Sequence, residues 1–390
     1  MSFAIEHSKY GKGLESMEQE KLGKTLLFYN GDWHKQRPLR FADCFAMPVD
    51  ELLSIFHSGN YRKNTGTFLM TDCLAKNIDA EHVLAYDFDR LKNSGASTIV
   101  TNALHCFSPR YVFNKEYWQK ILDLNTRLVP MTLGFRYHEN GKFHLTKDML
   151  YILRQIAERN EIGVRGEYAA EILNSYGIKN LRIVGCPSLF YHMDREFQVI
   201  NTPRQIRRIN FNFNQCFTDY FQTHVDFWQT ARPIFDYFLA QFHSRRVQVD
   251  YTLQTAFLKE VIGYDNFIGW EVVKAFVMER GRYFFSVDDW MTALKMNDIS
   301  IGTQFHGNVA AILARTPALM IAIDKRMEEL ARYHRIPYIM AEDFNPNKTV
   351  GYYQELCDYA RFNSSYAAAY DTFVDYCIKN GVALKVPTGR

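Results

Sequence analysis

The stretch ISIGTQFHGNVAAILARTPALMIAIDK, residues 299–325, decides the fold of this chain. A β-branched run ends at Gly302, a helix of small residues begins near Gly307, and a second apolar strand follows Pro317. Strand–loop–helix–strand units of this kind belong to open α/β sheets, which place ligands at the carboxyl ends of their strands. Helix amino ends also favour anions, because their free N–H groups point outward. The unit therefore predicts a site for a phosphorylated or carboxylated small molecule.

Strands and helices alternate on both sides of this unit, which predicts mostly parallel sheets. The strands predicted for the first half are KTLLFYNGDW (24–33), STIVTNAL (97–104), RLVPMTLGFR (127–136), IGVRG (162–166) and LRIVGCP (181–187). Helices are predicted at 47–60, 68–78, 145–160 and 167–177. In the second half we predict strands at 208–214, 247–252, 282–287 and 338–340, and helices at 217–243, 324–336 and 351–380.

The polar segment from Met193 to Arg208 separates the two series and is the predicted linker. We expect an α/β fold of two Rossmann-like domains, residues 1–195 and 205–390, that face each other across a cleft. Thr146 is the expected cap of helix 145–160, and Asp288 or Asp289 that of the helix after strand 282–287. Pro233 is expected to interrupt helix 217–243.

Composition excludes several classes of protein. The 390 residues are 47% hydrophobic and 23% charged, which is typical of globular chains and argues against disorder. A net charge of +3 without a basic, aromatic-interleaved stripe argues against nucleic acid as a partner. The seven scattered cysteines include no CxxC pair, which argues against structural zinc and favours a reducing compartment. With no secretory signal and no apolar span, we expect a cytoplasmic protein.

His306 is the first candidate for chemistry. A lone histidine is more often structural than catalytic, but this one lies at a strand end, precedes a glycine and adjoins a helix start. An imidazole in that position can transfer a proton to a substrate, or bind an anion when it is charged.

Arg165 and Lys325 are the next candidates. Arg165 ends a short strand immediately before Gly166 and a helix, where a guanidinium can grip phosphate or carboxylate. Its alternative reading is a surface arginine at a helix start. Lys325 follows an apolar strand and can reach the same cleft, or it can simply open a charged helix.

The remaining motifs are weaker. Gly59, Asn60 and Gly66 form a turn-rich loop that can carry backbone N–H groups toward a ligand, although it lacks the ending of a Walker loop. Asp288 and Asp289 can form a metal pair, but a helix cap explains them better. Cys186 beside Pro187 reads as a buried thiol.

Three segments resemble the polysaccharide pyruvyl transferases. The early segment SGNYRKNTG (58–66) looks like a degenerate form of the family's Gly-Asn loop. The middle segment, GVRGEYAAEILNSYGIKNLRIVGCPSLF (163–190), is similar to the family's V-R-[DG] strand end, helix and following strand. The third, GTQFHGNVAAILARTPALMIAIDKRMEELARYHRI (302–336), is similar to its s-R-x-H-[GA] strand end, small-residue helix and following Lys.

The resemblance implies roles for particular residues. Arg165 and His306 match the family's donor-site positions, Lys325 matches its lysine after the last strand, and Asn60 matches its early loop. Gly307 begins the helix beside the donor. The chain departs from the pattern at Gln304, where the family usually has Arg, and at Cys186, where it usually has Asp. Losing Arg at 304 leaves open a different donor, a compensating cation or lost activity.

The resemblance also implies a GT-B-like fold and a function. Such enzymes transfer pyruvate from phosphoenolpyruvate to two sugar hydroxyls, as a ketal, in the synthesis of capsule, exopolysaccharide or cell-wall polymers. We expect His306 to be the general acid/base, with Arg165, Gln304, Gly307, Lys325 and Asn60 binding substrate. No cofactor or metal is expected. The acceptor would be a glycan or lipid-linked sugar, met in the cytoplasm or at the inner face of the membrane. The alternatives are a GT-B glycosyltransferase with a nucleotide-sugar donor, and a non-catalytic family member.

Overall fold

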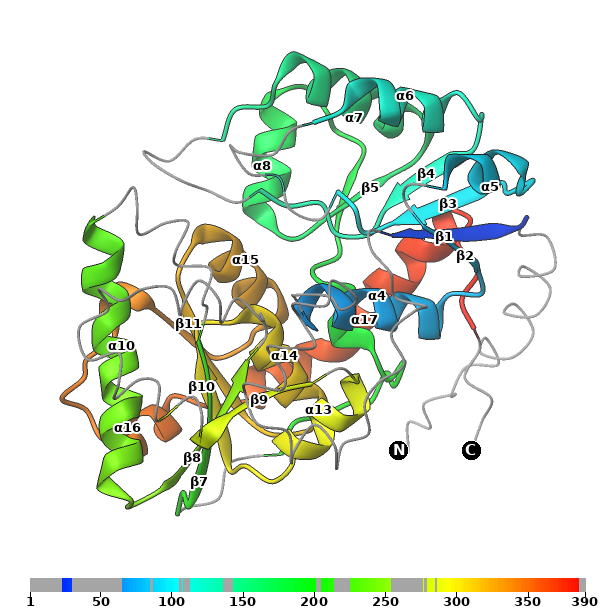
Figure 1. Cartoon of the computed structure of the whole chain (residues 1–390). Coiled ribbons are helices and arrows are strands. Elements are labelled where there is room, and N and C mark those ends of the chain that lie inside the picture. Colours follow the sequence, from blue (N-terminus) through cyan, green and yellow to red (C-terminus); the bar gives the residue numbers. More distant parts are fainter. Residues whose placement is uncertain are drawn as a thin grey trace, which may run out of the picture.

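The computed structural model describes residues 23–29, 65–84, 87–104, 107, 113–135, 143–200, 205–213, 225–253, 276, 279–284 and 286–385. Within these ranges the chain forms two parallel β-sheets flanked by helices, one in each half (Figure 1). The predicted fold class, α/β with two Rossmann-like units, is confirmed. The predicted boundaries at 195 and 205 stay a prediction.

In the first half, the described strands of the main sheet follow the order β2-β1-β3-β4. A parallel bridge between Leu133 and Val164 continues this sheet into the pair β5-β6. The strands are β1 (Thr25–Tyr29), β2 (Glu81–Leu84), β3 (Thr98–Thr101), β4 (Arg127–Pro130), β5 (Ile162–Val164) and β6 (Leu181–Ile183). The helices between them are α4 (Thr65–Asn77), α5 (Phe88–Asn93), α6 (Lys115–Leu122), α7 (Lys147–Arg159) and α8 (Glu167–Ser175). Sequence analysis missed β2, α5 and α6.

The second half contains a sheet whose described strands follow the order β12-β11-β10-β7-β8-β9, all parallel. This is the doubly wound Rossmann order, in which the chain reverses direction across the sheet between its first and fourth strands. Here that switch point lies between β7 and β10. The strands are β7 (Arg208–Asn212), β8 (Gln248–Leu253), β9 (Gly281–Tyr283), β10 (Ile299–Gly302), β11 (Ala318–Ala322) and β12 (Tyr338–Met340).

The helices of the second half include α10 (Val225–Ser244), α13 (Val287–Leu294), α14 (Phe305–Leu313), α15 (Lys325–His334), α16 (Val350–Glu355) and α17 (Ala360–Lys379). Short 3₁₀ turns, η2 (Pro187–Phe190) and η4 (Ala341–Asp343), follow β6 and β12. Every residue of α14 is buried. Its small side chains, among them Gly307, Ala310 and Ala311, allow it to pack tightly between β11, α13 and α4.

The predicted helix cap is confirmed for α7, whereas the predictions for the cap of α13 and for a break in α10 are wrong. Thr146 caps α7, because its hydroxyl accepts a hydrogen bond from the Met149 N–H at 3.2 Å. The cap of α13 is Ser286 and not Asp288 or Asp289, which lie in its first turn and complement the helix dipole. Pro233 lies inside α10 without ending it.

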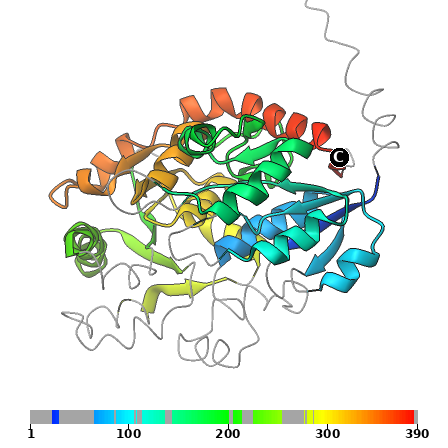
Figure 2. The same cartoon turned by 90° about the horizontal axis from the view of Figure 1, so that it is seen from above.

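The last helix, α17, joins the two halves. It runs along one side of the molecule, past both sheets (Figures 1 and 2). At its start the Ala318 N–H of β11 donates to the Tyr359 hydroxyl at 3.0 Å. Near its end, Tyr376 donates from its hydroxyl to the Pro130 carbonyl at 2.7 Å and accepts from the Gly163 N–H at 2.9 Å. Thus α17 is bonded to β11 of the second sheet and to β4 and β5 of the first half.

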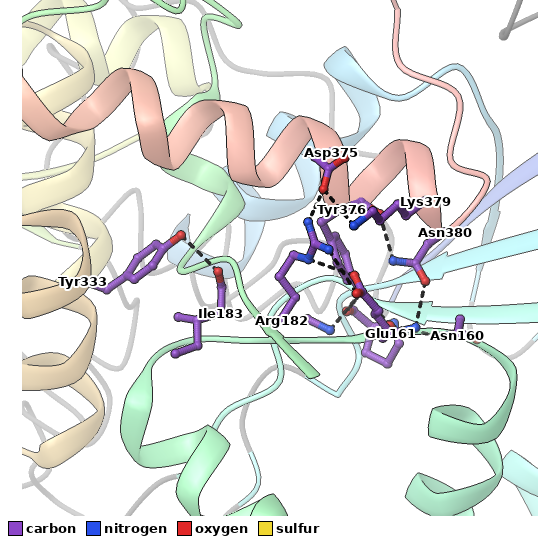
Figure 3. A network of polar contacts seen from close by, with 11 residues as sticks. Asn160, Glu161, Arg182, Ile183, Tyr333, Asp375, Tyr376, Lys379 and Asn380 are labelled. Atoms are coloured by element: carbon purple, nitrogen blue, oxygen red, sulfur yellow. Dashed lines mark hydrogen bonds and ion pairs between the residues drawn. The ribbon is translucent and has the colours of Figure 1, made fainter. Parts of the chain in front are cut away.

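Figure 3 shows the polar network around the end of α17. Arg182 of β6 forms ion pairs with Glu161, at 2.8 Å, and with Asp375 of α17. The Glu161 N–H donates to the Asn380 side chain at 3.1 Å. Apart from these contacts, Tyr333 of α15 donates to the Ile183 carbonyl at 3.0 Å and so links the second half to β6. These contacts fix the second half against β5 and β6.

We expect Tyr376→Phe to lower the free energy of unfolding by about 1–3 kcal/mol, because it leaves a buried N–H and a buried carbonyl without their partner. Urea unfolding measures the change. Tyr352→Phe is the matched control, since the Tyr352 side chain is exposed, and a shift below about 0.5 kcal/mol is expected there. Equal shifts in the two variants would show that the Tyr376 hydroxyl contributes nothing to stability.

Candidate functional site

The switch point of the second sheet holds the segment that sequence analysis selected. The carboxyl ends of β7 and β10 lie side by side there, with Asn212 paired to Gly302. The chain leaves β10 through Thr303 and Gln304 and enters α14 at Phe305. His306 therefore lies in the first turn of α14, at the edge of the sheet where α/β proteins bind ligands.

A buried amide network shapes this loop. The Asn212 side chain accepts from the Gln304 N–H at 2.9 Å and donates to Asn308 at 3.0 Å and Ser300 at 3.1 Å. Asn308 in turn donates to the carbonyls of Gly302 and Gln304, both at 2.9 Å. Because all these groups are buried and paired, the network fixes the backbone just before His306. The alternating Asn residues of RINFN carried this signal, which sequence analysis did not use.

Two of the predicted binding residues, Gln304 and Gly307, lie beside this amide network. The Gln304 amide donates to the Phe213 carbonyl, so its side chain is turned toward the end of β7. Gly307 lies against Asn212, and a Cβ at position 307 would come within 2.9 Å of the Asn212 side chain. The glycine at 307 thus lets the start of α14 approach Asn212 closely.

His306 is nearly buried, with 7% of its surface exposed. Its Nε2 lies 3.7 Å from the Sγ of Cys186, which comes from the first half of the chain. Cys186 follows β6 and is fully buried, as predicted. Its Sγ also lies 2.9 Å from the Ser188 hydroxyl. The histidine of the second half therefore meets the first half at this thiol.

Arg165, in the first half, acts on the same thiol through its charge. It follows β5, is 1% exposed, and donates from Nε to the Thr132 carbonyl at 3.4 Å. The alternative interpretation of Arg165 as a surface arginine is therefore wrong. Gly134 makes room for its stem, because a Cβ at 134 would lie 2.5 Å from the Arg165 Cδ. Burial raises the pKa of the Cys186 thiol, and the positive charges of Arg165 and Arg326 oppose that rise.

A backbone contact holds this junction together. The Cys186 N–H donates to the Nε2 of His334, at the end of α15, over 3.0 Å. Burial lowers the pKa of His334 to about 3, so its ring is neutral and can accept. His334 was not predicted as a contact residue, although its helical spacing from Met327, Leu330 and Ala331 places it on the buried face of α15.

No described contact brings Lys325 to this junction. Lys325 opens α15, is largely exposed, and pairs with Glu328 at 2.6 Å, which raises its pKa. It opens a charged helix and also lines a cavity of about 660 Å³ between α8, α15 and α17, so its role in binding stays a prediction. Asn60, with Gly59, lies outside the described residues.

Glu329 is a further residue that sequence analysis missed. It lines the same cavity from α15, yet it is 6% exposed, and its Oε2 accepts from the Ala169 N–H of α8 at 3.0 Å. Burial raises its pKa to about 7, against the opposing charges of Arg165 and Arg326. A buried carboxyl with a pKa raised toward neutral pH, on which the charge of an arginine also acts, is a candidate functional position.

The described residues contain neither a metal-binding cluster nor a membrane-spanning helix. No group of three or more His, Cys, Asp or Glu is placed to hold a metal ion within the described ranges. In the same part of the chain, no helix has the length and apolar character needed to cross a membrane.

A sequence model of the family described as polysaccharide pyruvyl transferase matches residues 121–325, more than half of the chain. The chain belongs to this family. The match spans Arg165, Cys186, Gln304 and His306, so the junction of the two halves coincides with the family's own segment. A comparison with curated proteins gives no match.

Solved structures with a similar chain fold include one protein bound to UDP and one whose description names a UDP-sugar. Staphylococcus aureus MnaA with UDP is 12% identical, with a TM-score of 0.45 over 91% of this pyruvyl transferase family member and 94% of that chain. A Listeria monocytogenes protein described as a UDP-N-acetylglucosamine 2-epimerase is 10% identical, with a TM-score of 0.42 and 91% of each chain covered. The wall teichoic acid polymerase TagF is 15% identical, with a TM-score of 0.34, over 92% of this chain and 85% of its own.

We expect Gly302→Ala to be strongly destabilising, by about 3 kcal/mol or more, because the added Cβ would lie 1.8 Å from the Asn212 carbonyl oxygen. Thermal unfolding measures the change. Gly351→Ala is the control, since its nearest neighbour would be 3.6 Å away, and α16 should gain about 0.5 kcal/mol. If both variants unfold at the same temperature, the close packing of β7 against β10 is not required for stability.

Proposed function

We propose that this pyruvyl transferase moves pyruvate from phosphoenolpyruvate to two hydroxyls of a sugar in a bacterial surface polysaccharide or its precursor, as a ketal. The observation that carries the proposal is the junction at Cys186. There the imidazole of the second half lies 3.7 Å from a buried thiol of the first half, and the charge of a buried guanidinium from the first half acts on that thiol. A donor with a phosphate and a carboxylate needs positive charge and a proton-transfer group in one place.

The reaction needs few protein groups. Protonation of the terminal carbon of phosphoenolpyruvate gives a cationic centre at the neighbouring carbon, which one sugar hydroxyl attacks. The bond from that carbon to the phosphate oxygen breaks, and inorganic phosphate leaves. The second hydroxyl then attacks the same carbon and closes the ketal. Two hydroxyl protons are released, and together they replace the proton added to the donor and the one that phosphate carries away.

The residues take the following roles in the proposal. His306 is the general acid/base, and Arg165 binds the donor anion. The amino end of α14 at Gly307 adds favourable backbone dipoles, and Gln304 hydrogen-bonds the donor or holds the end of β7 beside it. Lys325 and Asn60 bind substrate farther from the reacting carbon. The two domains, 1–195 and 205–390, would each supply one side of the site.

The acceptor in this proposal is a glycan or a lipid-linked sugar intermediate. The enzyme would act in the cytoplasm, with peripheral association at the inner face of the cell membrane, where lipid-linked intermediates are assembled. No cofactor takes part in the proposed reaction.

His306→Ala should reduce pyruvyl transfer by about 10²–10⁴-fold, which is the usual contribution of general acid/base catalysis. Mass spectrometry of a glycan mixture incubated with enzyme and phosphoenolpyruvate detects the ketal, and a phosphate assay follows the leaving group. His243→Ala is the control, because His243 is exposed at the end of α10. Unchanged transfer by His306→Ala would exclude the proposed role.

Gln304 supports one rival, a non-catalytic family member, because the usual arginine is absent and the amide is bound to the Phe213 carbonyl. We expect the unaltered chain to turn over phosphoenolpyruvate. Turnover that appears only in Gln304→Arg would favour the rival. A thermal-shift screen of donors separates the other alternative, since stabilisation by a nucleotide sugar and not by phosphoenolpyruvate would indicate a glycosyltransferase.

A further inference from the structure

Glu329 of α15 connects the second half to the start of α8, the helix that follows Arg165. Its Oε2 accepts the Ala169 N–H, which is one of the free N–H groups at the start of α8. The approach is close, because a Cβ at Gly166 would lie 2.9 Å from both the Cβ and Oε2 of Glu329. A side chain of the second half therefore caps a helix of the first half, and that helix begins two residues after Arg165.

The capping bond to α8 uses only one oxygen of the Glu329 carboxyl, yet both oxygens are buried. Within the described part of the chain, its Oε1 is buried and has no hydrogen-bond partner. A buried carboxylate oxygen in that state is unfavourable, and a proton on the carboxyl relieves the penalty. A cap alone would need only the Oε2 contact, which a neutral side chain can make equally well.

The charges around Glu329 divide into an inner and an outer set. The inner set acts on it directly: Arg165 after β5 and Arg326 on α15 favour the ionised form, and Asp324 at the start of α15 opposes it. Among the outer charged groups at the cavity, Lys325 pairs with Glu328 at 2.6 Å and Arg332 with Glu167 at 3.7 Å. Glu171 of α8 and Arg335 at the end of α15 also line the cavity. From α17, the cavity is lined by uncharged residues, including Ser365 and Thr372.

We propose that Glu329 is a positioning residue of the donor site, and that it takes up a proton from solvent when an anion binds at Arg165. This inference rests on the proposed function for the identity of the anion. An anion beside Arg165 shares the guanidinium that otherwise favours ionised Glu329, and its own negative charge repels the carboxylate. Both effects increase the carboxyl's affinity for a proton.

The consequence for binding follows from linkage. If an anion increases proton affinity, a proton increases anion affinity by the same factor. Affinity for the donor should therefore fall as pH rises above neutral, by up to about tenfold per pH unit while one proton is taken up. The cap on α8 persists throughout, because a protonated carboxyl still accepts through its carbonyl oxygen.

The first test needs no ligand. The pKa of Glu329 is about 7 in the folded protein against 4.5 as the ordinary value, so the folded state binds more protons between these limits. Its contribution to stability must then fall as pH rises from about 4.5 to 7. In Glu329→Gln this part of the pH dependence should be absent, whereas Glu171→Gln, an exposed carboxyl on the same cavity, should keep the wild-type curve.

The second test measures proton uptake in calorimetry of phosphoenolpyruvate binding at pH 8, in two buffers with different ionisation enthalpies. The wild type and Glu171→Gln should take up about half a proton or more per bound donor. Glu329→Gln should take up almost none, and its donor affinity should vary little between pH 7.5 and 9. Equal uptake in Glu329→Gln and the wild type would overturn the proposal, as would the absence of uptake in the wild type, which needs no variant.

Failure of the donor assignment would look different. If phosphoenolpyruvate does not bind to the wild type, the proposed function fails, while the ligand-free curves still decide whether Glu329 carries a proton near neutral pH. Inorganic phosphate then serves as the probe anion in the same calorimetry. Phosphate binding without proton uptake, or no binding of either anion, would overturn the link between Glu329 and Arg165.

Discussion

The hydrogen bond from the Cys186 N–H to the His334 ring is the contact on which the rest of the junction depends. It joins the end of β6 in the first half to the end of α15 in the second. It requires Gly185, which has φ +70° and whose Cβ would lie 2.0 Å from the His334 Nε2. It also requires a neutral imidazole, which burial ensures. Once this backbone is fixed, the Cys186 side chain faces His306, and the first half presents Arg165 beside it.

The C-terminal helix α17 stabilises this arrangement. Two sheets held together only at one strand end would move apart readily. Because α17 is bonded to β11 near its start and to β4 and β5 near its end, the distance between the sheets is set along one continuous element. Burial of Tyr376 and the Arg182 ion pairs act at the far end of that element, away from the chemistry. The junction can therefore hold buried polar groups without loss of the overall fold.

The sequence predicted what depends on local pattern. The β10–α14–β11 unit was visible because apolar runs, a strand-ending glycine and small helical residues lie within one short segment. The Thr146 cap was likewise local. The partners of Glu329, His334 and Asn212 could not be found in this way, because Ala169, Cys186 and Gln304 are distant from them in the chain. The helical spacing of His334 and the alternating asparagines of β7 are visible locally, but only the tertiary contacts show which groups they bind.

The two departures from the family pattern, at Gln304 and Cys186, both change the charge at the junction. Replacing the usual arginine by Gln304 removes a positive charge, and replacing the usual aspartate by Cys186 removes a negative one. Burial raises the pKa of the Cys186 thiol, so it is neutral, and the two changes together leave the net charge of the junction unaltered. Arg165 then acts beside a neutral thiol and not beside a carboxylate, so less of its charge is compensated within the protein. Glu329 is a buried carboxyl on which this arginine acts, and in our proposal its proton occupancy sets how much positive charge the site offers to an anion.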